Sequence, residues 1–331
     1  MTSSPASRPA GLRSTPTSTS PSPPYGPWSG GGKRLRPAFC HWGFVGAGGG
    51  ADDPRVVDAG AALELLHTFA LVHDDIMDDS VRRHGIDCLH VDFAARHRAR
   101  RWHGEDRRFG DGAAILIGDL AFVYADHLLR GAPAAALEIY TELRLEVNIG
   151  QYLDLVGTAS RQASLHQART ICVYKSGKYT IERPLHLGAA LAGRLDDLAK
   201  PFTEYGIPLG EAFQLRDDLL GAFGDGDRLG KRVGEDLRDG KPTALYAFTR
   251  DRATGADAEL LDGRFGHADL TPDDLAAIQH IMESTGARAT VERSVGELTE
   301  VAIAAIAAAD IEGEARRELV ALAEFVAGRD F

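Results

Sequence analysis

The sequence predicts an all-α protein. Segments in which apolar residues recur at helical spacing follow one another along the chain, and Gly-, Pro- or Asp-rich turns separate them. No pair of alternating apolar and polar segments predicts a strand pair. One segment, residues 63–72, is apolar on nearly every side, which is typical of a helix inside a bundle.

The N-terminal segment, residues 1–30, is rich in Ser, Thr, Pro and Gly, and we expect it to be disordered. Residues 31–331 are predicted to form one helical domain, because a chain of 331 residues with 44% hydrophobic content can bury a large core. Asp53 followed by Pro54 is typical of a helix start. That helix should run from Pro54 to the acidic residues that begin at Asp74.

The rest of the chain follows the same pattern. Further helices are predicted at residues 39–44, 111–129, 133–156, 164–191, 198–220, 243–252, 271–284, 287–309 and 312–327. A short helix with a loop is expected within residues 86–112, and a loop within residues 224–241.

Composition narrows the class of protein. A net charge of −11 argues against a nucleic-acid partner, so none is expected. No unbroken apolar run reaches the length of a transmembrane segment, and no apolar signal core is visible near Met1. The three cysteines show no metal-binding spacing, which favours a reducing, cytoplasmic location.

An acidic cluster ends the most apolar helix. Asp74 and Asp78 are four residues apart, so they point the same way, and two such carboxylates repel unless a cation lies between them. Oxygen ligands without Cys or paired His favour Mg²⁺. Arg82 and Arg83 follow, and arginine suits phosphate contacts. The pattern indicates a substrate with an apolar tail and a diphosphate, whereas the simpler alternative is a solvated helix end.

A second acidic pair, Asp217 and Asp218, ends another apolar helix, so the two clusters could face each other across a bundle cavity. Three groups of basic residues accompany the acids and could contact phosphate, although a lysine taken alone is more often a solvated surface residue. The groups are Lys33 with Arg36, Lys175 with Lys178, and Lys231 with Lys241.

Together these motifs resemble the trans-polyprenyl diphosphate synthases, or polyprenyl synthetases, and among them the bacterial geranylgeranyl diphosphate synthases. The matching pieces are GGKRLRP at 31–37, ELLHTFALVHDDIMDDSVRRHG at 64–85, GD at 118–119, GQYLDL at 150–155, YKSGKYTIERPL at 174–185, FQLRDDLL at 213–220 and GKRVGEDLRDGKPTAL at 230–245. The resemblance implies an isoprenoid synthase fold around a central cavity and a homodimer. It also implies a Mg²⁺-dependent condensation of isopentenyl diphosphate with an allylic diphosphate.

The resemblance also assigns roles to single residues. Asp74 and Asp78 would bind two Mg²⁺ ions, Asp75 would assist them, and Asp217 would hold a third ion. The isopentenyl diphosphate site would comprise Lys33, Arg36, His67 and Arg83. The allylic diphosphate side would comprise Arg82, Lys175, Gln214, Lys231 and Lys241, and Gln151 and Asp154 would line the cavity beside the reacting carbons.

Three features depart from the family pattern. Gly221 stands where the second acidic motif usually has its last Asp, and Ser176 stands where Thr is commoner. The segment before residue 31 is rich in Pro and Ser, where family members usually have a helix or two. We therefore keep a non-catalytic partner subunit as one alternative function, and a terpene cyclase on the same fold as another.

Product length is the last expectation. Phe69 and Ala70 precede Asp74 by five and four residues, about one helical turn at ~1.5 Å per residue. The Phe69 ring could form a floor for the growing tail, or it could simply pack in the core. By resemblance this combination favours a C20 product, geranylgeranyl diphosphate, with the C15 farnesyl product as the alternative.

Overall fold

The computed structural model describes residues 33–83, 85–160, 164–224, 233–267 and 269–328. The N-terminal segment 1–30, for which we predicted disorder, lies outside these residues. The chain divides into two units, Met1–Lys33 and Arg34–Phe331, and every helix among the described residues belongs to the second unit. Lys33 is the one described residue of the first unit, so its predicted place beside Arg36 stays a prediction.

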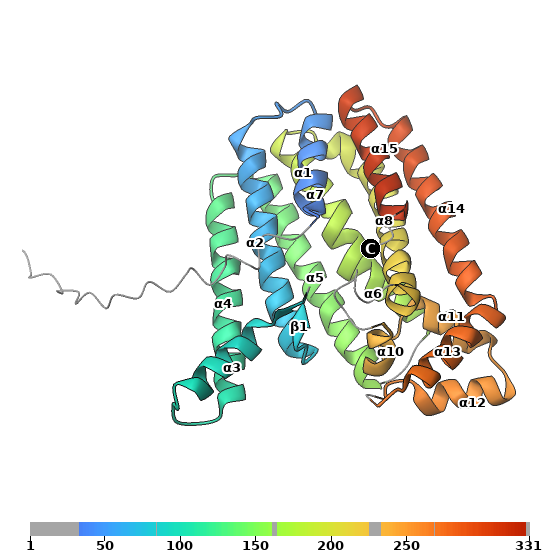
Figure 1. The fold of residues 1–331 in the computed structure, drawn as a ribbon. Coiled ribbons are helices and arrows are strands. Elements are labelled where there is room, and N and C mark those ends of the chain that lie inside the picture. The colour runs from blue at the N-terminus through green and yellow to red at the C-terminus, as the bar shows by residue number, and fades with distance from the viewer. Residues whose placement is uncertain (1–32, 84, 161–163, 225–232, 268, 329–331) are drawn as a thin grey trace, which may run out of the picture. The chain divides into compact units, whose positions relative to one another are not determined.

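The prediction of an all-α fold is confirmed, because the second unit is built from packed helices (Figure 1). Its long helices and their partners are α1 (Leu35–Gly46), α2 (Pro54–Met77), α3 (Leu89–Ala99), α4 (Asp106–Leu129), α5 (Ala134–Ser160), α6 (Leu165–Cys172), α7 (Arg183–Leu191), α8 (Leu195–Phe223), α10 (Glu235–Asp239), α11 (Ala244–Arg252), α12 (Gly255–Arg264), α13 (Pro272–Ser284), α14 (Ala287–Ala308) and α15 (Gly313–Gly328). A π-helix, η1 (Val173–Glu182), joins α6 to α7.

Helix α2 begins and ends as the sequence predicts. The Asp53 side chain accepts a hydrogen bond from the backbone N–H of Arg55, and Pro54 occupies the first turn. Leu63 and Leu66 are fully buried along its length. The helix stops where Asp79 adopts a left-handed backbone conformation, with φ 52°. Its acidic C-terminal end is therefore held at one fixed place in the bundle.

Helix α8 packs against η1 and against α14, and η1 also packs against α5. In Figure 1, α8 lies between α5 and α14. Two glycines allow the closest of these contacts. A Cβ atom on Gly210 would lie 2.0 Å from the Cα atom of Gly177, and one on Gly150 would lie 2.8 Å from the backbone nitrogen of Lys175. Any side chain at Gly210 or Gly150 would push η1 away from α8 or α5.

Several local predictions were wrong. A short antiparallel strand pair, β1 (Arg82–Arg83) with β2 (Ile86–Asp87), follows α2, although no strand pair was expected. Only two residues pair on each side, which is too short for an alternating pattern to be visible. The fourth helix starts at Asp106 rather than 111, η1 interrupts the helix expected at 164–191, and α10 and α12 were not expected as helices.

Two helices, α2 and α4, are long and apolar enough to cross a membrane by length and composition, contrary to the expectation from unbroken apolar runs. This is weak evidence for a membrane span, because core helices pass the same test. Leu63 and Leu66 place α2 in the core. The expected absence of a transmembrane segment stays a prediction.

Candidate active site

The acidic end of α2 is held by an arginine from β1. Asp75 is 1% exposed, and Arg83 donates a hydrogen bond from Nε to its carboxylate at 2.8 Å. The same guanidinium reaches Asp74 at 3.2 Å. Burying a carboxylate is costly unless it is paired, so Arg83 is what allows Asp75 to point inward. The short strand pair thereby fixes the direction of the acidic cluster.

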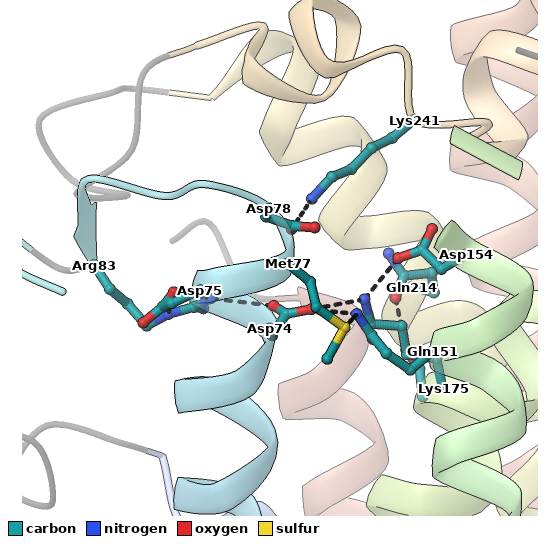
Figure 2. Close-up of polar contacts among 11 residues, drawn as sticks. Asp74, Asp75, Met77, Asp78, Arg83, Gln151, Asp154, Lys175, Gln214 and Lys241 are labelled. Carbon is teal, nitrogen blue, oxygen red and sulfur yellow. Dashed lines mark hydrogen bonds and ion pairs between the residues drawn. The ribbon is translucent and has the colours of Figure 1, made fainter. Parts of the chain in front are cut away.

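Helices α5 and η1 bring three further side chains to Asp74. Gln151 donates to Asp74 at 2.9 Å, and Lys175 Nζ lies 3.2 Å from the same carboxylate oxygen. Lys175 also donates to Asp154 at 2.6 Å. Figure 2 shows these side chains pointing toward one another between α2 and α5. The structure thus brings together residues that lie up to 101 positions apart in the sequence.

These contacts set the charge of Asp74. Burial by itself would raise the pKa of Asp74, but Lys175, Arg83 and Lys241 outweigh it and lower the pKa to about 2. Burial likewise opposes the charge of Lys175, yet Asp74 and Asp154 raise the pKa of that lysine above its ordinary value. Both groups are therefore charged at neutral pH.

Lys241 approaches from the segment after α10 and donates to Asp78 at 2.6 Å, as Figure 2 shows. Burial would lower the pKa of Lys241, but Asp78, Asp236 and Asp74 together raise it. The ammonium groups of Lys175 and Lys241 thus supply the positive charge that allows Asp74 and Asp78 to lie side by side.

The two residues of the second acidic pair, Asp217 and Asp218, lie in different environments. Asp218 is 4% exposed; its carboxylate accepts hydrogen bonds from Gln214 and from the backbone N–H of Ala244, both at 3.0 Å. Burial, with help from Asp236 and Asp217, raises the pKa of Asp218 to about 7. Asp218 therefore anchors the start of α11, whereas Asp217 is only partly buried.

Gln214 links the two acidic clusters. Ser176, the residue after Lys175, donates to Gln214 at 2.6 Å, and Gln214 in turn donates to Asp218. Ser176 stands where Thr is commoner, and its hydroxyl makes this hydrogen bond to Gln214. The end of α8 and the end of α2 are consequently connected through η1.

Gly221, which stands where the second acidic motif usually has its last Asp, lies against Asp236. A Cβ atom at Gly221 would lie 2.9 Å from Oδ2 of Asp236, which is tighter than normal contact allows. The Gly221 carbonyl also accepts a hydrogen bond from the backbone N–H of Gly234 at 2.9 Å. The carboxylate of Asp236, from α10, therefore lies beside the point from which any side chain at position 221 would extend.

Two of the predicted isopentenyl diphosphate residues, Arg36 and His67, lie on α1 and α2. Arg36 donates to the Thr180 hydroxyl at 3.0 Å, and its guanidinium carbon lies 4.3 Å from the centre of the Tyr179 ring. Burial, and after it the charges of Arg36 and Arg83, lower the pKa of His67 well below its ordinary value. His67 is therefore neutral at pH 7 and lies on the same side of α2 as Asp74.

Other predicted residues fall outside the cluster. Arg82 is exposed and donates to Asp87 of β2 at 2.8 Å, so it stabilises the strand pair. The Phe69 ring packs against Phe122 of α4, with centroids 4.9 Å apart, beside the partly buried Ala70. Lys231 lies outside the described residues.

Sequence reasoning missed Tyr179 and Asp236. Tyr179 comes four residues after Lys175, a spacing that places two side chains on the same side of a helix. Asp236 lies inside the GKRVGEDLRDGKPTAL motif but had no role assigned. Both residues act through contacts with distant parts of the chain, which spacing alone does not indicate.

Among the described residues, no three Asp, Glu, His or Cys side chains converge closely enough to hold a metal ion by themselves. Magnesium sites commonly use one or two carboxylates together with substrate phosphates and water. The donor set of Asp74 and Asp78 therefore fits Mg²⁺ that is shared with a bound diphosphate.

Comparison with known proteins agrees with this geometry. A model of the family described as polyprenyl synthetase matches residues 27–282. The geranylgeranyl diphosphate synthase of Saccharolobus solfataricus is 33% identical over 76% of this chain and 73% of its own length. The (2E,6E)-farnesyl diphosphate synthase of Mycobacterium tuberculosis strain H37Rv is 30% identical over 90% and 80%.

A solved structure is also similar. It is the geranylgeranyl pyrophosphate synthase of Corynebacterium glutamicum, complexed with isoprenyl diphosphate and magnesium. It is 38% identical, with a TM-score of 0.84, and the match covers 90% of this chain and 87% of that chain.

Proposed function

The chain belongs to the polyprenyl synthetase family, and we propose that its acid-and-lysine cluster carries out a Mg²⁺-dependent condensation of isopentenyl diphosphate with an allylic diphosphate. The enzyme is a chain-elongating prenyltransferase. The observation that carries the mechanistic proposal is the convergence of Asp74 and Asp78 with Lys175 and Lys241 at the end of an apolar helix.

Three carboxylates would hold the metal. Asp74 and Asp78 face the same space, and Asp217 would contribute from α8, by resemblance to the family's second acidic motif. Magnesium ions, when bound, would supply positive charge that stabilises the departing diphosphate. The relative from Corynebacterium glutamicum, whose structure contains magnesium and isoprenyl diphosphate, supports this choice of ion. About three ions are proposed from the family resemblance.

The chain's own cations would bind and stabilise the allylic diphosphate. Lys175 and Lys241 are mostly buried and stay charged, so they would favour the negative charge that develops as the diphosphate leaves. Gln151 and Gln214 would orient it, and Lys231 is proposed for the same side. Arg82, being exposed and paired with Asp87, would have to leave that pair to take part.

The second substrate would lie beside Arg36 and His67, with Arg83 and Lys33 as further proposed contacts. Its double bond would attack the allylic carbon that loses diphosphate, and, by resemblance to the family, the departed diphosphate would take the proton that the new chain then loses. The reaction needs no protein nucleophile. The apolar residues of α2 would exclude water, which would otherwise quench the cationic carbon.

We propose geranylgeranyl diphosphate as the product, because geranylgeranyl synthases are the best represented among the relatives. Phe69 and Ala70 would limit the tail, one helical turn before Asp74. The farnesyl product is the alternative, which the mycobacterial relative represents. The product assay must therefore distinguish a C20 product from a C15 product.

A homodimer is proposed from the exposed apolar side chains of α4 and α5, because contiguous exposed apolar surface marks interfaces. These side chains are Leu116, Leu120, Val123 and Tyr124 on α4, and Leu145, Ile149 and Tyr152 on α5, with exposed fractions from 46% to 67%. Light scattering of the purified protein tests the dimer. Cytoplasmic residence is proposed as well, since Cys40, Cys88 and Cys172 are all free thiols.

The purified protein should be incubated with isopentenyl diphosphate and with dimethylallyl, geranyl or farnesyl diphosphate, with Mg²⁺ or with a chelator. Chromatography of the dephosphorylated products is expected to show geranylgeraniol with Mg²⁺ and no product with the chelator. No turnover by the chain alone would favour a non-catalytic subunit. Terpene formation without isopentenyl diphosphate would favour a cyclase.

A further inference from the structure

We propose that Tyr179 is a positioning residue for isopentenyl diphosphate, which it serves by holding Arg36 and His67 in place. The inference rests on the proposed function, because that function assigns Arg36 and His67 to this substrate. Tyr179 is 3% exposed and lies on η1, between α1 and α2. Tyr179 is therefore a buried residue rather than a surface residue.

The first contact is between Tyr179 and Arg36. The guanidinium carbon of Arg36 lies 4.3 Å from the ring centre, within the range of a cation–π interaction, and the next residue, Thr180, accepts a hydrogen bond from it at 3.0 Å. Two neighbouring residues of η1 thus fix both the face and one edge of the guanidinium. Such a group is held in one orientation before any ligand arrives.

Arg36 has unused donor capacity in this position. Its Nε is buried, and no described residue accepts a hydrogen bond from it. Buried donors in proteins nearly always have a partner, and a guanidinium offers five N–H groups in a fork that suits phosphate oxygens. The unmet buried donor of this cation therefore points to an anionic ligand beside Tyr179.

The second contact is between Tyr179 and His67. The Tyr179 hydroxyl lies 3.5 Å from Nδ1 of His67, at the outer limit of a hydrogen bond, and the two ring centroids are 6.2 Å apart. A neutral imidazole that accepts a hydrogen bond at Nδ1 carries its own hydrogen on Nε2. His67 can then donate to a diphosphate oxygen from the nitrogen opposite Tyr179.

The π-helix explains why one residue can serve both partners. Lys175 and Tyr179 belong to the same ten-residue segment, and Lys175 contacts Asp74 and Asp154 on the allylic side. π-helical turns are rare and occur frequently at functional sites. Segment η1 thus supports both substrate sites, with Tyr179 on the isopentenyl side.

The test compares Tyr179→Leu and Tyr179→Phe with wild type and with Tyr205→Leu as a control. Tyr205 is also fully buried, but its hydroxyl donates to the Leu319 carbonyl, away from both substrate sites. Steady-state kinetics give KM for each substrate, and calorimetry measures binding of isopentenyl diphosphate alone. Circular dichroism reports whether each variant is folded.

Tyr179→Leu should weaken the binding of isopentenyl diphosphate, raising both its KM and its calorimetric Kd by about tenfold, because the cation–π contact is lost. The KM for the allylic diphosphate should stay unchanged. Tyr179→Phe keeps the ring face, so its affinity for isopentenyl diphosphate should fall much less. Tyr205→Leu should lower stability and leave the ratio of the two KM values unchanged. If Tyr179→Leu fails to fold, Thr180→Val removes the hydroxyl from Arg36 at nearly constant shape and should raise KM for isopentenyl diphosphate alone.

The inference is overturned if folded Tyr179→Leu binds isopentenyl diphosphate like wild type, or if both KM values rise together. It is also overturned if Thr180→Val, tested in its place, changes neither. Failure of the proposed function looks different, because wild type itself would then show neither turnover nor binding of isopentenyl diphosphate.

Discussion

The ammonium nitrogen of Lys241 lies 2.6 Å from a carboxylate oxygen of Asp78, although 163 residues separate the two in the chain. Their side chains are 21% and 16% exposed. The contact joins the end of α2 to the segment that follows α10. Removing one partner of a mostly buried pair leaves the other charge without compensation, so both residues must be considered together.

Lys241→Met should lower kcat/KM by about a hundredfold, because a preorganised cation beside a departing diphosphate is lost. The effect should appear in steady-state kinetics in which one substrate is varied while the other is kept saturating. Lys200→Met is the matched control, since the Lys200 side chain is 84% exposed and lies beside Glu204 on the surface of α8. Unchanged turnover in Lys241→Met would show that this lysine serves folding alone.

Asp74→Asn should destabilise the metal-free protein by about 2 kcal/mol at pH 7. The pKa of Asp74 is lowered from 3.8 to about 2 in the fold, so the ionised form is favoured there. A lowered pKa means that this stability is present above pH 4 and is lost as pH falls through 2. The measurement is urea unfolding with a chelator.

The control for Asp74→Asn is the pH series itself. The difference in unfolding free energy between wild type and variant should be largest at neutral pH and shrink as the medium approaches the lowered pKa of about 2. A difference that stayed constant over that range would mean that its cause is packing rather than the charge of Asp74.

Gly221→Asp restores the usual family pattern but should reduce the free energy of unfolding only modestly, because the Asp236 carboxylate is the end of a flexible side chain and can move aside. A Cβ atom at Gly221 would lie 2.9 Å from Asp236, and a second carboxylate beside Asp236 would repel it. Thermal unfolding measures the loss, and kinetics measure any accompanying loss of turnover.

A double-mutant cycle makes this prediction specific. Gly221→Asp combined with Asp236→Ala should recover much of the stability lost by Gly221→Asp alone, because contacting residues are not additive. Equal losses with and without Asp236 would contradict the idea that Asp236 occupies the place of the missing side chain.

The sequence predicted the parts of this protein that depend on local order. Helical spacing placed Asp74 and Asp78 on one side of α2, and the family motifs named Lys175, Gln151 and Lys241, all of which the structure brings to the same cluster. The sequence did not indicate a very short strand pair or the contacts between distant helices.

Two cases show the physical reason. Arg82 was expected at the allylic diphosphate, but the two-residue strand pair turns it outward to Asp87, and no sequence pattern marks so short a pair. Tyr179 was overlooked because its partners, Arg36 and His67, come from helices more than a hundred residues earlier in the chain.

Phe69→Ala should lengthen the product only modestly. The Phe69 ring packs on Phe122 at a centroid distance of 4.9 Å and on His73 at 4.5 Å, so Phe122 would still block the space beyond it. Phe69→Ala with Phe122→Ala removes both rings and should give distinctly longer chains, because each deletion opens a cavity in the apolar core.

This prediction, that Phe69 blocks the tail first and Phe122 second, is tested by product size. The dephosphorylated products of wild type, both single variants and the double variant are compared by chromatography. Phe122→Ala alone should leave the product as it is, because the Phe69 ring would still be in place. An unchanged chain length in Phe69→Ala and in the double variant would mean that Phe69 packs only in the core between α2 and α4, and that another part of the cavity stops the tail.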